Sequence, residues 1–413
     1  MLSPFRALRY DPRLADLTRV TSPPYDVIDA AGVAALEEMS DVNVVRLILP
    51  RDAASEGDRY GRAAETLVSW RAAGVLRTDD HPALYVYEQA SATHAQRGLL
   101  GALALSPAED GIVLPHENTM SDTVSDRLAL YQAVDADLEP IFLVYAGGGA
   151  ASAAVAGVSA REPLVDVTLP DGLRHRLWAI TDEAELEDVA ADLHPRSALI
   201  ADGHHRYATY LQRQAAADGP GPDDFGLVFL VDSTAFGPEV HPIHRVLPGV
   251  DTAELARRTA AAAHVHDLDG QDLESALAAL STAGSSGPSY LLVSGDGGTI
   301  RLVTQLAPER LAGALPGDRS AAWRALDVSV LHHVLVTDVW GLTDDTTTVG
   351  YEHDVEAALA TAQRTDGTAV LLNPTPAEAV AAVAAQGERM PRKSTLFTPK
   401  PRTGLVIRDH RDA

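Results

Sequence analysis

Short apolar runs that suit β-strands alternate with alanine-rich runs that suit helices along the first 145 residues. The strand candidates are residues 44–49, 83–87, 98–105 and 141–145, and residues 63–73 have helical spacing. Such a mixture is typical of proteins in which helices and a sheet share one core. The pattern therefore predicts a mixed α/β (α+β) fold.

The same mixture continues to the C-terminus. We expect strands at 197–201 and 226–231, a hairpin from 290–293 and 300–303, and helices at 252–263, 321–336 and 377–385. The Gly/Ser-rich residues 283–289 give the clearest linker or long-turn signal. We therefore expect an N-terminal α/β portion, residues 1–282, and a C-terminal α/β portion, residues 283–413.

Composition excludes several classes of function. The 413 residues include 33 Lys plus Arg against 58 Asp plus Glu, which gives a formal net charge of -25, and they include no Cys. The missing thiols exclude disulfides, thiolate metal sites and cysteine nucleophiles. The acidic surplus argues against nucleic acid as a partner. The sequence also lacks a signal-peptide pattern and a run of about 18 apolar residues, so we expect a cytoplasmic protein that binds no membrane. Its oligomeric state stays open.

The most informative segment runs from Ser197 to Tyr207, where an apolar strand leads through Asp-Gly into an amphipathic helix. A helix N-terminus favours phosphate, Gly203 lets the backbone approach a ligand, and Arg206 can bind phosphate oxygens with two N–H groups. Asp202 could accept a proton or hold Mg²⁺, and His205 could donate a proton. The alternative is an ordinary Asp-Gly turn with a helix cap. The clustering at the end of a strand favours a site.

Five separated motifs resemble the DUF1015 family of bacterial and archaeal proteins, and together they extend over nearly the whole chain. The motifs are Ser22-Pro-Pro-Tyr-Asp-Val27, Asn43-Val-Val-Arg-Leu47, Pro115-His-Glu-Asn-Thr119, Asp202-Gly-His-His-Arg-Tyr207 and Met390-Pro-Arg-Lys-Ser-Thr395. The family name assigns no chemistry.

The Asp-Gly-x-His-Arg pattern is also similar to the phosphate-binding signature of the ParB/sulfiredoxin-like superfamily, which includes free serine kinases. This resemblance implies a phosphate-binding core of that type with large additions. It makes Asp202 the catalytic or metal-proximal carboxylate and places His205 and Arg206 at the transferred phosphate. Gly203 and His204 are grouped with the phosphate ligands, although the position of His204 varies in the motif.

Two further motifs supply candidates for catalysis and substrate binding. Glu117 is the candidate second carboxylate near a substrate hydroxyl, with His116 beside it as a substrate contact; an exposed loop and ion pair would explain the same residues. In the stiff Pro-Pro segment, Tyr25 could stack on a ligand and Asp26 could bind an amino group, or the segment could be a turn packed on the core. Arg46, inside an apolar run, needs a partner, which could be a ligand anion or an internal acid.

A basic segment near the C-terminus is conspicuous in so acidic a chain. It gathers five cations within fourteen positions, 389–402. Hydroxyl groups beside a lysine suit phosphate, so we favour anion binding over neutralisation of an acidic neighbouring face. The predicted phosphate ligands of this segment are Arg392, Lys393, Ser394 and Thr395.

These patterns favour a small-molecule phosphotransferase, most concretely a free L-serine kinase that forms O-phosphoserine. The expected donor is ATP, ADP or pyrophosphate, and the expected metal is Mg²⁺ held with the help of Asp202. A nucleotide-binding switch or adaptor, which would use the same helix N-terminus without transferring phosphate to a small molecule, is the alternative. A hydrolase is a weaker third option.

Overall fold

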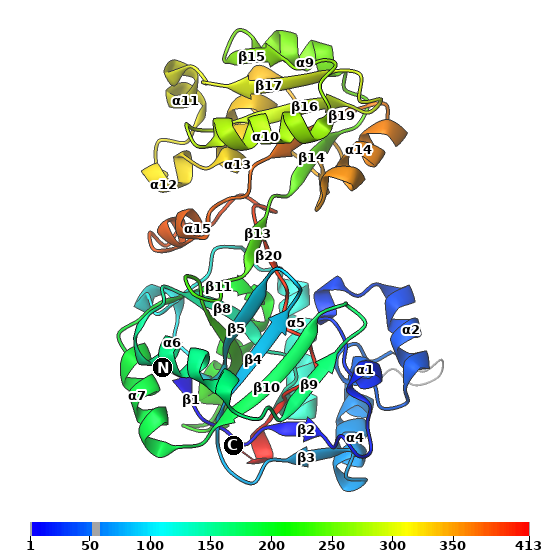
Figure 1. Cartoon of the computed structure of the whole chain (residues 1–413), viewed down its shortest axis with the longest axis vertical. Helices are drawn as coiled ribbons and strands as arrows, with labels where there is room; N and C mark the ends of the chain where they lie inside the picture. Colours follow the sequence, from blue (N-terminus) through cyan, green and yellow to red (C-terminus); the bar gives the residue numbers. More distant parts are fainter. Residues whose placement is uncertain (1, 52–57, 413) are drawn as a thin grey trace. The chain divides into compact units, whose positions relative to one another are not determined.

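The computed structural model describes residues 2–51 and 58–412. By their internal contacts, these residues divide into two compact units (Figure 1). Unit 1 consists of the described residues of Met1–Pro238 and of Pro399–Ala413, and unit 2 is Glu239–Thr398. The chain thus leaves unit 1, builds unit 2, and returns to unit 1 for its last residues.

This division differs from the one predicted at residue 282, which falls inside unit 2. The Gly/Ser-rich residues 283–289 form the turn between helix α10 (Leu273–Gly284) and strand β16 (Tyr290–Ser294). Gly287 has a φ of +142°, a conformation that side chains disfavour. The glycines of this stretch therefore form a tight turn. Turns and linkers share a Gly/Ser-rich composition, so the composition alone could not distinguish them.

Unit 1 is built on a mixed sheet whose nine described strands combine parallel and antiparallel pairs. The path runs β6-β11-β8-β12-β5-β4-β10-β9, and β1 pairs with β5. The strand β11 is parallel to β6 and antiparallel to β8. The strands are β1 (Leu2–Ser3), β4 (Leu84–Ala90), β5 (Ala95–Ala104), β6 (Val113–Leu114), β8 (Ile141–Tyr145), β9 (Val165–Thr168), β10 (Arg174–Ile180), β11 (Ala198–Asp202) and β12 (Phe225–Asp232).

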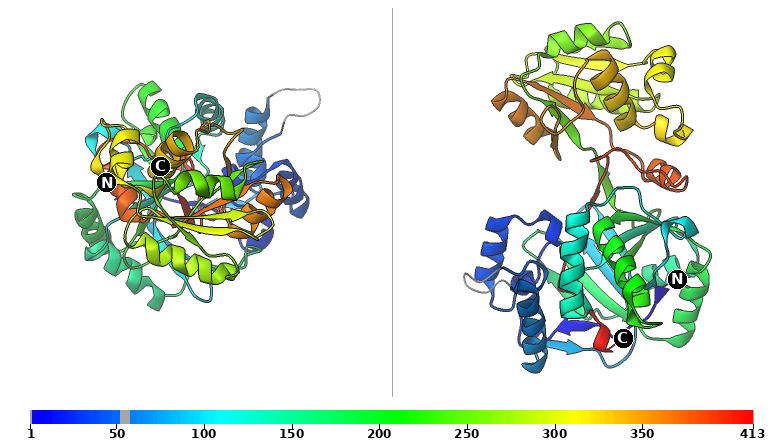
Figure 2. Two further views of the ribbon diagram at one scale, coloured as in Figure 1. Left: turned by 90° about the horizontal axis from the view of Figure 1, so that it is seen from above. Right: turned by 180° about the vertical axis from the view of Figure 1, so that it is seen from behind.

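Helices cover both faces of this sheet. Helices α6 and α7 pack on one face, while α5 and α8 lie side by side on the other, with α4 beside α5 (Figures 1 and 2). The helices are α1 (Leu17–Val20), α2 (Ala30–Met39), α3 (Val45–Ile48), α4 (Arg59–Ala72), α5 (Ser121–Val134), α6 (Gly149–Gly157), α7 (Glu183–Leu193) and α8 (His204–Ala216), with short 3₁₀ turns η1 (Tyr25–Val27), η2 (Ala108–Asp110), η3 (Val158–Ala160), η4 (Pro222–Asp224) and η6 (His410–Asp412).

The C-terminal segment is fastened into unit 1 along its length. Its strand β21 (Arg408–Asp409) pairs with β7 (Ala136–Asp137), and Ile407 exchanges backbone hydrogen bonds with Leu8 of β2 (Leu8–Tyr10), which itself pairs with β3 (Leu76–Thr78). Further upstream, Thr403 and Ser22 donate backbone hydrogen bonds to each other. These contacts fix where residues 399–403 lie.

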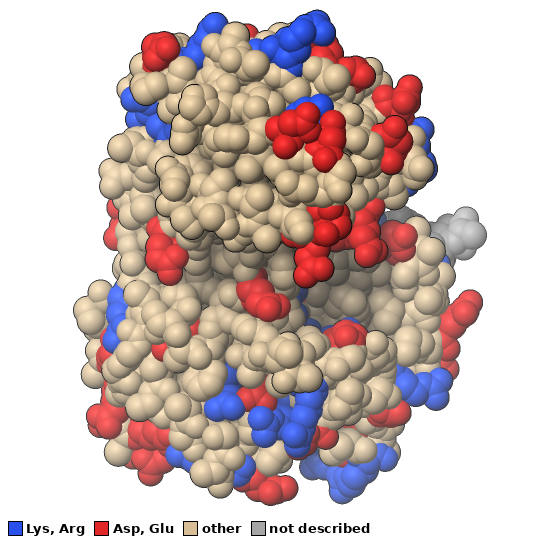
Figure 3. All heavy atoms as spheres, turned by 45° about the horizontal axis from the view of Figure 1, so that its top comes forward, with Lys and Arg blue, Asp and Glu red and all other residues tan. Residues whose placement is uncertain are grey.

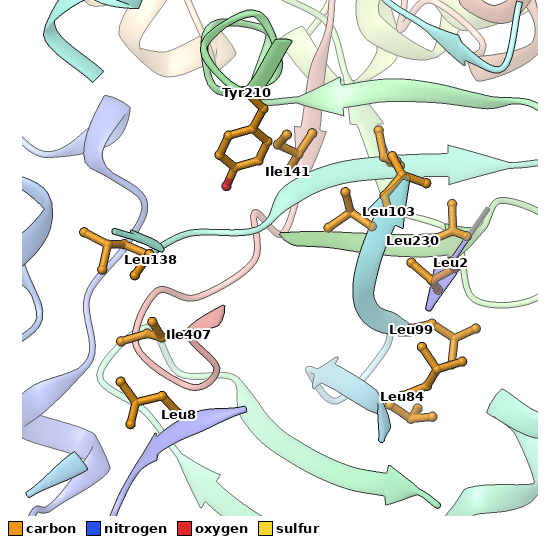
Figure 4. Packing of buried hydrophobic residues seen from close by; sticks show 14 of the residues in the cluster. Leu2, Leu8, Leu84, Leu99, Leu103, Leu138, Ile141, Tyr210, Leu230 and Ile407 are labelled. Atoms are coloured by element: carbon orange, nitrogen blue, oxygen red, sulfur yellow. The ribbon is translucent and has the colours of Figure 1, made fainter. Parts of the chain in front are cut away.

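Apolar side chains from elements far apart in sequence form the core of unit 1. Figure 4 shows Leu2, Leu8, Leu84 and Ile407 in the same packed cluster as Tyr210 of α8. All five are at most 2 % exposed. Burial of such side chains stabilises the unit by roughly 1.5–3 kcal/mol each, so both chain segments of unit 1 belong to one core.

Unit 2 has its own six-stranded antiparallel sheet, in the order β15-β17-β16-β19-β14-β18, and a separate pair β13–β20. The predicted hairpin of residues 290–293 and 300–303 is confirmed as β16 and β17. The further strands are β13 (Glu239–His241), β14 (His244–Leu247), β15 (His264–Asp267), β17 (Ile300–Thr304), β18 (Gly350–Glu352), β19 (Thr368–Leu372) and β20 (Leu396–Thr398), and the helices are α9 (Thr252–Thr259), α11 (Pro308–Ala314), α12 (Ala321–Arg324), α13 (Asp327–Val330), the π-helix η5 (Leu331–Val339), α14 (Val355–Arg364) and α15 (Ala377–Ala384).

The predicted mixed α/β class is confirmed, but one predicted strand is wrong. Residues 44–49 form the helical turn α3 instead of a strand. The carboxamide of Asn43 accepts a hydrogen bond from the N–H of Val45 at 2.9 Å, and its amide group donates to the carbonyl of Arg19 at 2.7 Å. Asx capping of this kind starts a helical turn, and it outweighs the β preference of a short Val-rich run.

Acidic side chains form several separate groups on the face of the protein that Figure 3 draws. On the face drawn in Figure 3, Asp and Glu side chains lie in separate groups with Lys and Arg side chains between them. None of the helices within residues 2–51 and 58–412 combines the length and the apolar character that crossing a bilayer requires.

Candidate functional site

The predicted strand–turn–helix of residues 197–207 is confirmed. Strand β11 ends at Asp202, Gly203 is the N-cap residue, and α8 begins at His204. Gly203, as the N-cap residue, makes no side-chain cap hydrogen bond to the first turn of α8. A helix N-terminus without a side-chain cap leaves N–H groups and the positive end of the helix dipole for an anion.

Gly203 is required here by both its backbone and its surroundings. Its φ of 97° lies in the left-handed region, and a Cβ built on it would lie 3.1 Å from Nε and Nη2 of Arg206. A side chain at this position would therefore strain the turn and press on the guanidinium group.

We expect Gly203→Ala to lower the free energy of unfolding by more than the roughly 1–2 kcal/mol that a left-handed alanine costs. The matched control is Gly111→Ala, because Gly111 also has a positive φ, of 69°, and has no described atom within 4 Å of the Cβ position. Urea unfolding of both variants measures the difference. Equal losses would show that the contact with Arg206 has no energetic effect.

The carboxylate of Asp202 is held by two cations. Its Oδ2 accepts from Nη2 of Arg206 at 2.6 Å, and its Oδ1 lies 2.6 Å from Nζ of Lys400. The same Nζ donates to Oδ2 of Asp26 at 2.9 Å. Burial lowers the pKa of Lys400, but the attraction of Asp202 and Asp26 outweighs it, so the pKa lies above its ordinary value. Lys400 is therefore a cation at neutral pH.

Arg206 is the buried centre of this cluster. Its side chain is 1 % exposed, Nη1 donates to the carbonyl of Pro140 at 2.7 Å, and Nε has no hydrogen-bond partner within the described residues. Burial lowers the pKa of Arg206, but Asp202, Glu139 and Asp26 raise it well above its ordinary range. A permanent buried cation with an unused donor suits the binding of an anion.

Glu139 is a fully buried carboxyl group behind Arg206. Its Oε1 accepts from the N–H of Tyr25 at 2.9 Å and from the hydroxyl of Thr403 at 3.1 Å, while Oε2 has no hydrogen-bond partner within the described residues. Burial raises the pKa of Glu139, although Arg206 and Arg127 oppose the rise. Glu139 thus joins the Pro-Pro segment to the returning C-terminal segment.

The predicted substrate residue Tyr25 lies against the cluster. Its ring faces two guanidinium groups, with Arg127 at 4.6 Å and Arg206 at 5.9 Å from the ring centroid. Burial raises its pKa to about 12, so the phenol keeps its proton. The two guanidinium groups already lie over the ring, so the ring forms one side of the cluster.

Asp26, predicted to bind an amino group, holds the ammonium group of Lys400 instead. Burial raises its pKa, but Lys400 and Arg206 outweigh burial and bring the pKa below its ordinary value. The prediction assigned the amino group of a substrate to the carboxylate of Asp26. In the structure, the ammonium group of Lys400 occupies that role.

The two histidines at the start of α8 hold the loop that carries Glu117. Nε2 of His204 accepts from the N–H of His116 at 3.2 Å, and Nε2 of His205 accepts from the N–H of Met120 at 3.1 Å. The ring of His116, which is buried, meets the ring of His204 edge-on at 4.6 Å. Oε2 of Glu117 lies 3.7 Å from Nδ1 of His204. The predicted residues His116, Glu117, His204 and His205 are therefore brought together, with His116 acting as a support.

His205 is expected to be neutral at pH 7. Burial lowers its pKa below the ordinary 6.5, Arg206 adds to this effect, and Asp26 and Asp202 oppose it. A neutral ring that accepts at Nε2 carries its proton on Nδ1. We predict that the ring signals of His205, followed by NMR against pH and assigned with His205→Gln, titrate with a midpoint below 6.5. A midpoint above 6.5 would show that the carboxylates dominate.

The structure does not bring Arg46 to the cluster. On α3, its Nη2 donates to the carbonyl of Glu37 at 2.9 Å, and its guanidinium group lies 3.9 Å from the Glu37 carboxylate and 3.8 Å from that of Asp41. The internal acid that the sequence left open as a partner of Arg46 is therefore present.

The four predicted phosphate ligands of the basic segment belong to unit 2, outside the unit 1 cluster. Nη2 of Arg392 lies 3.9 Å from Oδ1 of Asp344, and the hydroxyl of Ser394 donates to the carbonyl of Pro391. Lys393 is exposed and has a φ of 55°. Thr395 precedes β20. A role for these residues in phosphate binding stays a prediction.

Sequence analysis missed Lys400 and Glu139. Lys400 belongs to the basic segment from which Lys393 was chosen, and the prolines on both sides of Lys400 were a signal of a stiff, positioned backbone. Glu139 precedes Pro140 at the start of strand β8 and has no neighbouring motif. A buried carboxyl group of this kind is found only from long-range packing.

The predicted Mg²⁺ on Asp202 does not fit this arrangement. Both carboxylate oxygens of Asp202 already contact cations, Lys400 and Arg206. Within residues 2–51 and 58–412, no group of three or more His, Cys, Asp or Glu side chains is arranged to hold a metal ion. The cations that contact Asp202 in this structure are side chains of the chain itself.

Two cavities of unit 1, of about 270 and 180 Å³, lie elsewhere, near Tyr10 and Pro12. The larger is lined by charged groups that neutralise each other, with Nη2 of Arg9 2.6 Å from Oδ1 of Asp79. These two cavities share no lining residue with the Asp202 cluster.

The chain matches the family model described as "Protein of unknown function (DUF1015)" over residues 2–329. No curated protein matches it. Solved structures that it resembles include a free serine kinase variant in complex with ADP, at 14% identity and a TM-score of 0.36, covering 73% of this chain and 91% of that one. Another is SbnI with a C-terminal truncation from Staphylococcus aureus, at 10% identity and a TM-score of 0.36, covering 75% and 87%. The match to the family model extends over most of the sequence. The chain therefore belongs to the DUF1015 family.

Proposed function

We propose that the protein is a small-molecule phosphotransferase that phosphorylates the hydroxyl group of L-serine. The observation that carries the proposal is the arrangement at the N-terminus of α8. A helix start whose N-cap residue is a glycine lies beside the buried guanidinium of Arg206 and the ammonium of Lys400, and both cations are held by the carboxylate of Asp202. Phosphoryl transfer chiefly requires such positioned charge.

The first turn of α8 binds the transferred phosphoryl group in this proposal. The N–H groups of the turn, the Nδ1–H of His205 and the side chain of Lys400 donate to its oxygens. Arg206 adds a fixed positive charge from beneath. Gly203 keeps the backbone open to the phosphate, since any side chain there would fill the approach.

The transfer step forms one bond and breaks another. The serine hydroxyl oxygen attacks the terminal phosphorus of the donor, and the bond from that phosphorus to the bridging oxygen breaks. The hydroxyl proton passes to a remaining lone pair of the Asp202 carboxylate, and the electron pair leaves with the donor's bridging oxygen. Glu117, held beside His204, is the second carboxylate that faces the acceptor.

The donor is ATP, ADP or pyrophosphate, because each presents a terminal phosphoryl group to the same turn. The acceptor lies toward Glu117, whose side chain is 38% exposed. Amino-acid recognition by Asp26 would require its carboxylate to share its bonds between Lys400 and the substrate, because one oxygen already contacts the ammonium group.

The test is an assay of the purified full chain with L-serine and each donor in turn, with and without Mg²⁺. ³¹P NMR and mass spectrometry detect O-phosphoserine, and glycine, which lacks a hydroxyl group, is the control acceptor. We expect O-phosphoserine with at least one donor. Folded protein that forms none with any donor would exclude the kinase. Nucleotide binding that is independent of serine, without product, would favour the switch instead.

A further inference from the structure

Lys400 lies where two carboxylates meet. Its Nζ is 2.6 Å from Oδ1 of Asp202 and 2.9 Å from Oδ2 of Asp26. The side chain of Lys400 is 18% exposed and that of Asp202 is 12% exposed. Two carboxylate oxygens that converge on one small cation form an arrangement that proteins also use for divalent metal ions.

The backbone around Lys400 is held in place by buried side chains. Nε2 of Gln89 donates to the carbonyl of Lys400 at 2.9 Å, and Nε2 of Gln96 donates to the carbonyl of Pro399 at 2.9 Å. These two glutamines, on β4 and β5, are 2% and 0% exposed. Because buried amide groups need hydrogen-bond partners, these two bonds fix the backbone position of residues 399–400.

The choice of lysine at this point is itself informative. Of the 33 Lys and Arg residues in the chain, only Lys393 and Lys400 are lysine. An ammonium group is a compact charge, whereas a guanidinium group is planar and larger. Where the carboxylates of Asp26 and Asp202 converge, a compact cation can contact both and still turn a donor toward a ligand.

We propose that the ammonium group of Lys400 is a built-in substitute for a divalent cation between Asp26 and Asp202, and that it is a direct ligand of the bound phosphate. The second half of this proposal rests on the proposed function, and the first half does not. Lys400 lies outside residues 2–329, which match the family model. It belongs to the C-terminal segment that returns to unit 1, so this segment completes the site.

Charge arithmetic supports this role. Asp26 and Asp202 carry two negative charges, and Lys400 and Arg206 carry two positive ones, so the four groups balance. Without Lys400, two carboxylates would meet an incoming phosphate with one guanidinium to offset them. Carboxylates that approach the same cation repel each other strongly when they are partly buried. A divalent ion would then be needed to offset their charge.

The first experiment measures Mn²⁺ binding to the full chain by calorimetry and electron paramagnetic resonance. We expect no Mn²⁺ bound at this site in the unaltered protein and one Mn²⁺ bound by Lys400→Met, because the two carboxylates are then free to hold it. The double variant Asp26→Asn/Lys400→Met should lose that ion. Lys400→Gln serves as a second variant if Lys400→Met does not fold. The matched control is Lys393→Met, which removes the other lysine and should bind no Mn²⁺.

The second experiment measures pyrophosphate binding in the presence of EDTA. We expect the unaltered protein to bind pyrophosphate without metal, Lys400→Met to bind it about tenfold or more weakly, and Mn²⁺ to restore the affinity of Lys400→Met only. Two results would overturn the proposal. One is that the unaltered protein binds Mn²⁺ and that Asp26→Asn abolishes this binding. The other is that a folded Lys400→Met variant binds no Mn²⁺. If no form binds pyrophosphate but the Mn²⁺ result holds, the cation substitute stands and the phosphate-ligand half of the proposal fails. The proposed function is decided separately, by the O-phosphoserine assay with all three donors.

Discussion

If the proposed phosphorylation of L-serine takes place, replacing Asp202 with Asn is expected to lower its rate by about 10²–10⁴-fold. The carboxamide cannot accept the hydroxyl proton. It also removes the negative charge that holds Arg206 and Lys400 at 2.6 Å each. The variant should fold, because the strand β11 and the core residues beneath it are unchanged. Initial rates of O-phosphoserine formation and the circular dichroism of the variant are the measurements.

The matched control for this variant is Asp232→Asn. Asp232 ends the strand β12 as Asp202 ends β11 and is 3% exposed. It accepts from Ser152 at 2.6 Å and from Thr234 at 2.7 Å, which are not residues of the Asp202 cluster. We expect it to lose stability and keep the serine kinase rate. An Asp202→Asn protein that retains near-normal activity would show that Asp202 only shapes the turn.

Local patterns were sufficient to predict the strand–turn–helix at Asp202. A buried strand, a glycine with a positive φ and an amphipathic helix are each determined within a few residues, and all three are present as expected. The hairpin in unit 2 was predictable for the same reason. The wrong strand at residues 44–49 shows the limit of this method, since one carboxamide, Asn43, changes the conformation of a six-residue run.

Contacts between distant segments were not predictable in this way. Lys400 reaches Asp202 only because the chain returns to unit 1 at Pro399, and no local pattern announces that return. The basic segment of residues 389–402 looked like one cluster in sequence. The boundary at residue 398 divides it, so that Lys393 and Lys400 lie in different units. Closeness in sequence therefore did not mean membership of the same unit here.

Replacing Arg206 with Met is expected to lower the free energy of unfolding by about 3–5 kcal/mol, because it removes a buried cation from beside Asp202 and Glu139. Arg206 is 1% exposed, contacts the carboxylate of Asp202 at 2.6 Å and opposes the effect of burial on the pKa of Glu139. Burial already raises the pKa of Glu139 against the attraction of Arg206, so the variant should raise it further. A carboxyl group with a raised pKa in the folded state stabilises that state as the pH falls. The deficit of Arg206→Met should therefore shrink at acidic pH.

Arg213→Met on the same helix separates the structural effect of Arg206 from its effect on binding. Arg213 is 5% exposed and lies 2.9 Å from Oδ1 of the buried Asp137 and 2.8 Å from Oδ1 of Asp223, so its loss also removes a buried cation from beside carboxylates. Burial raises the pKa of Asp137, but Arg213 and His410 outweigh it and keep this pKa well below its ordinary value. Both variants should be less stable in urea. Only Arg206→Met should lose pyrophosphate binding, because Arg206 belongs to the first turn of α8, whereas Arg213 lies more than one turn further along the helix. Equal losses of binding would mean that Arg206 acts only by stabilising the fold.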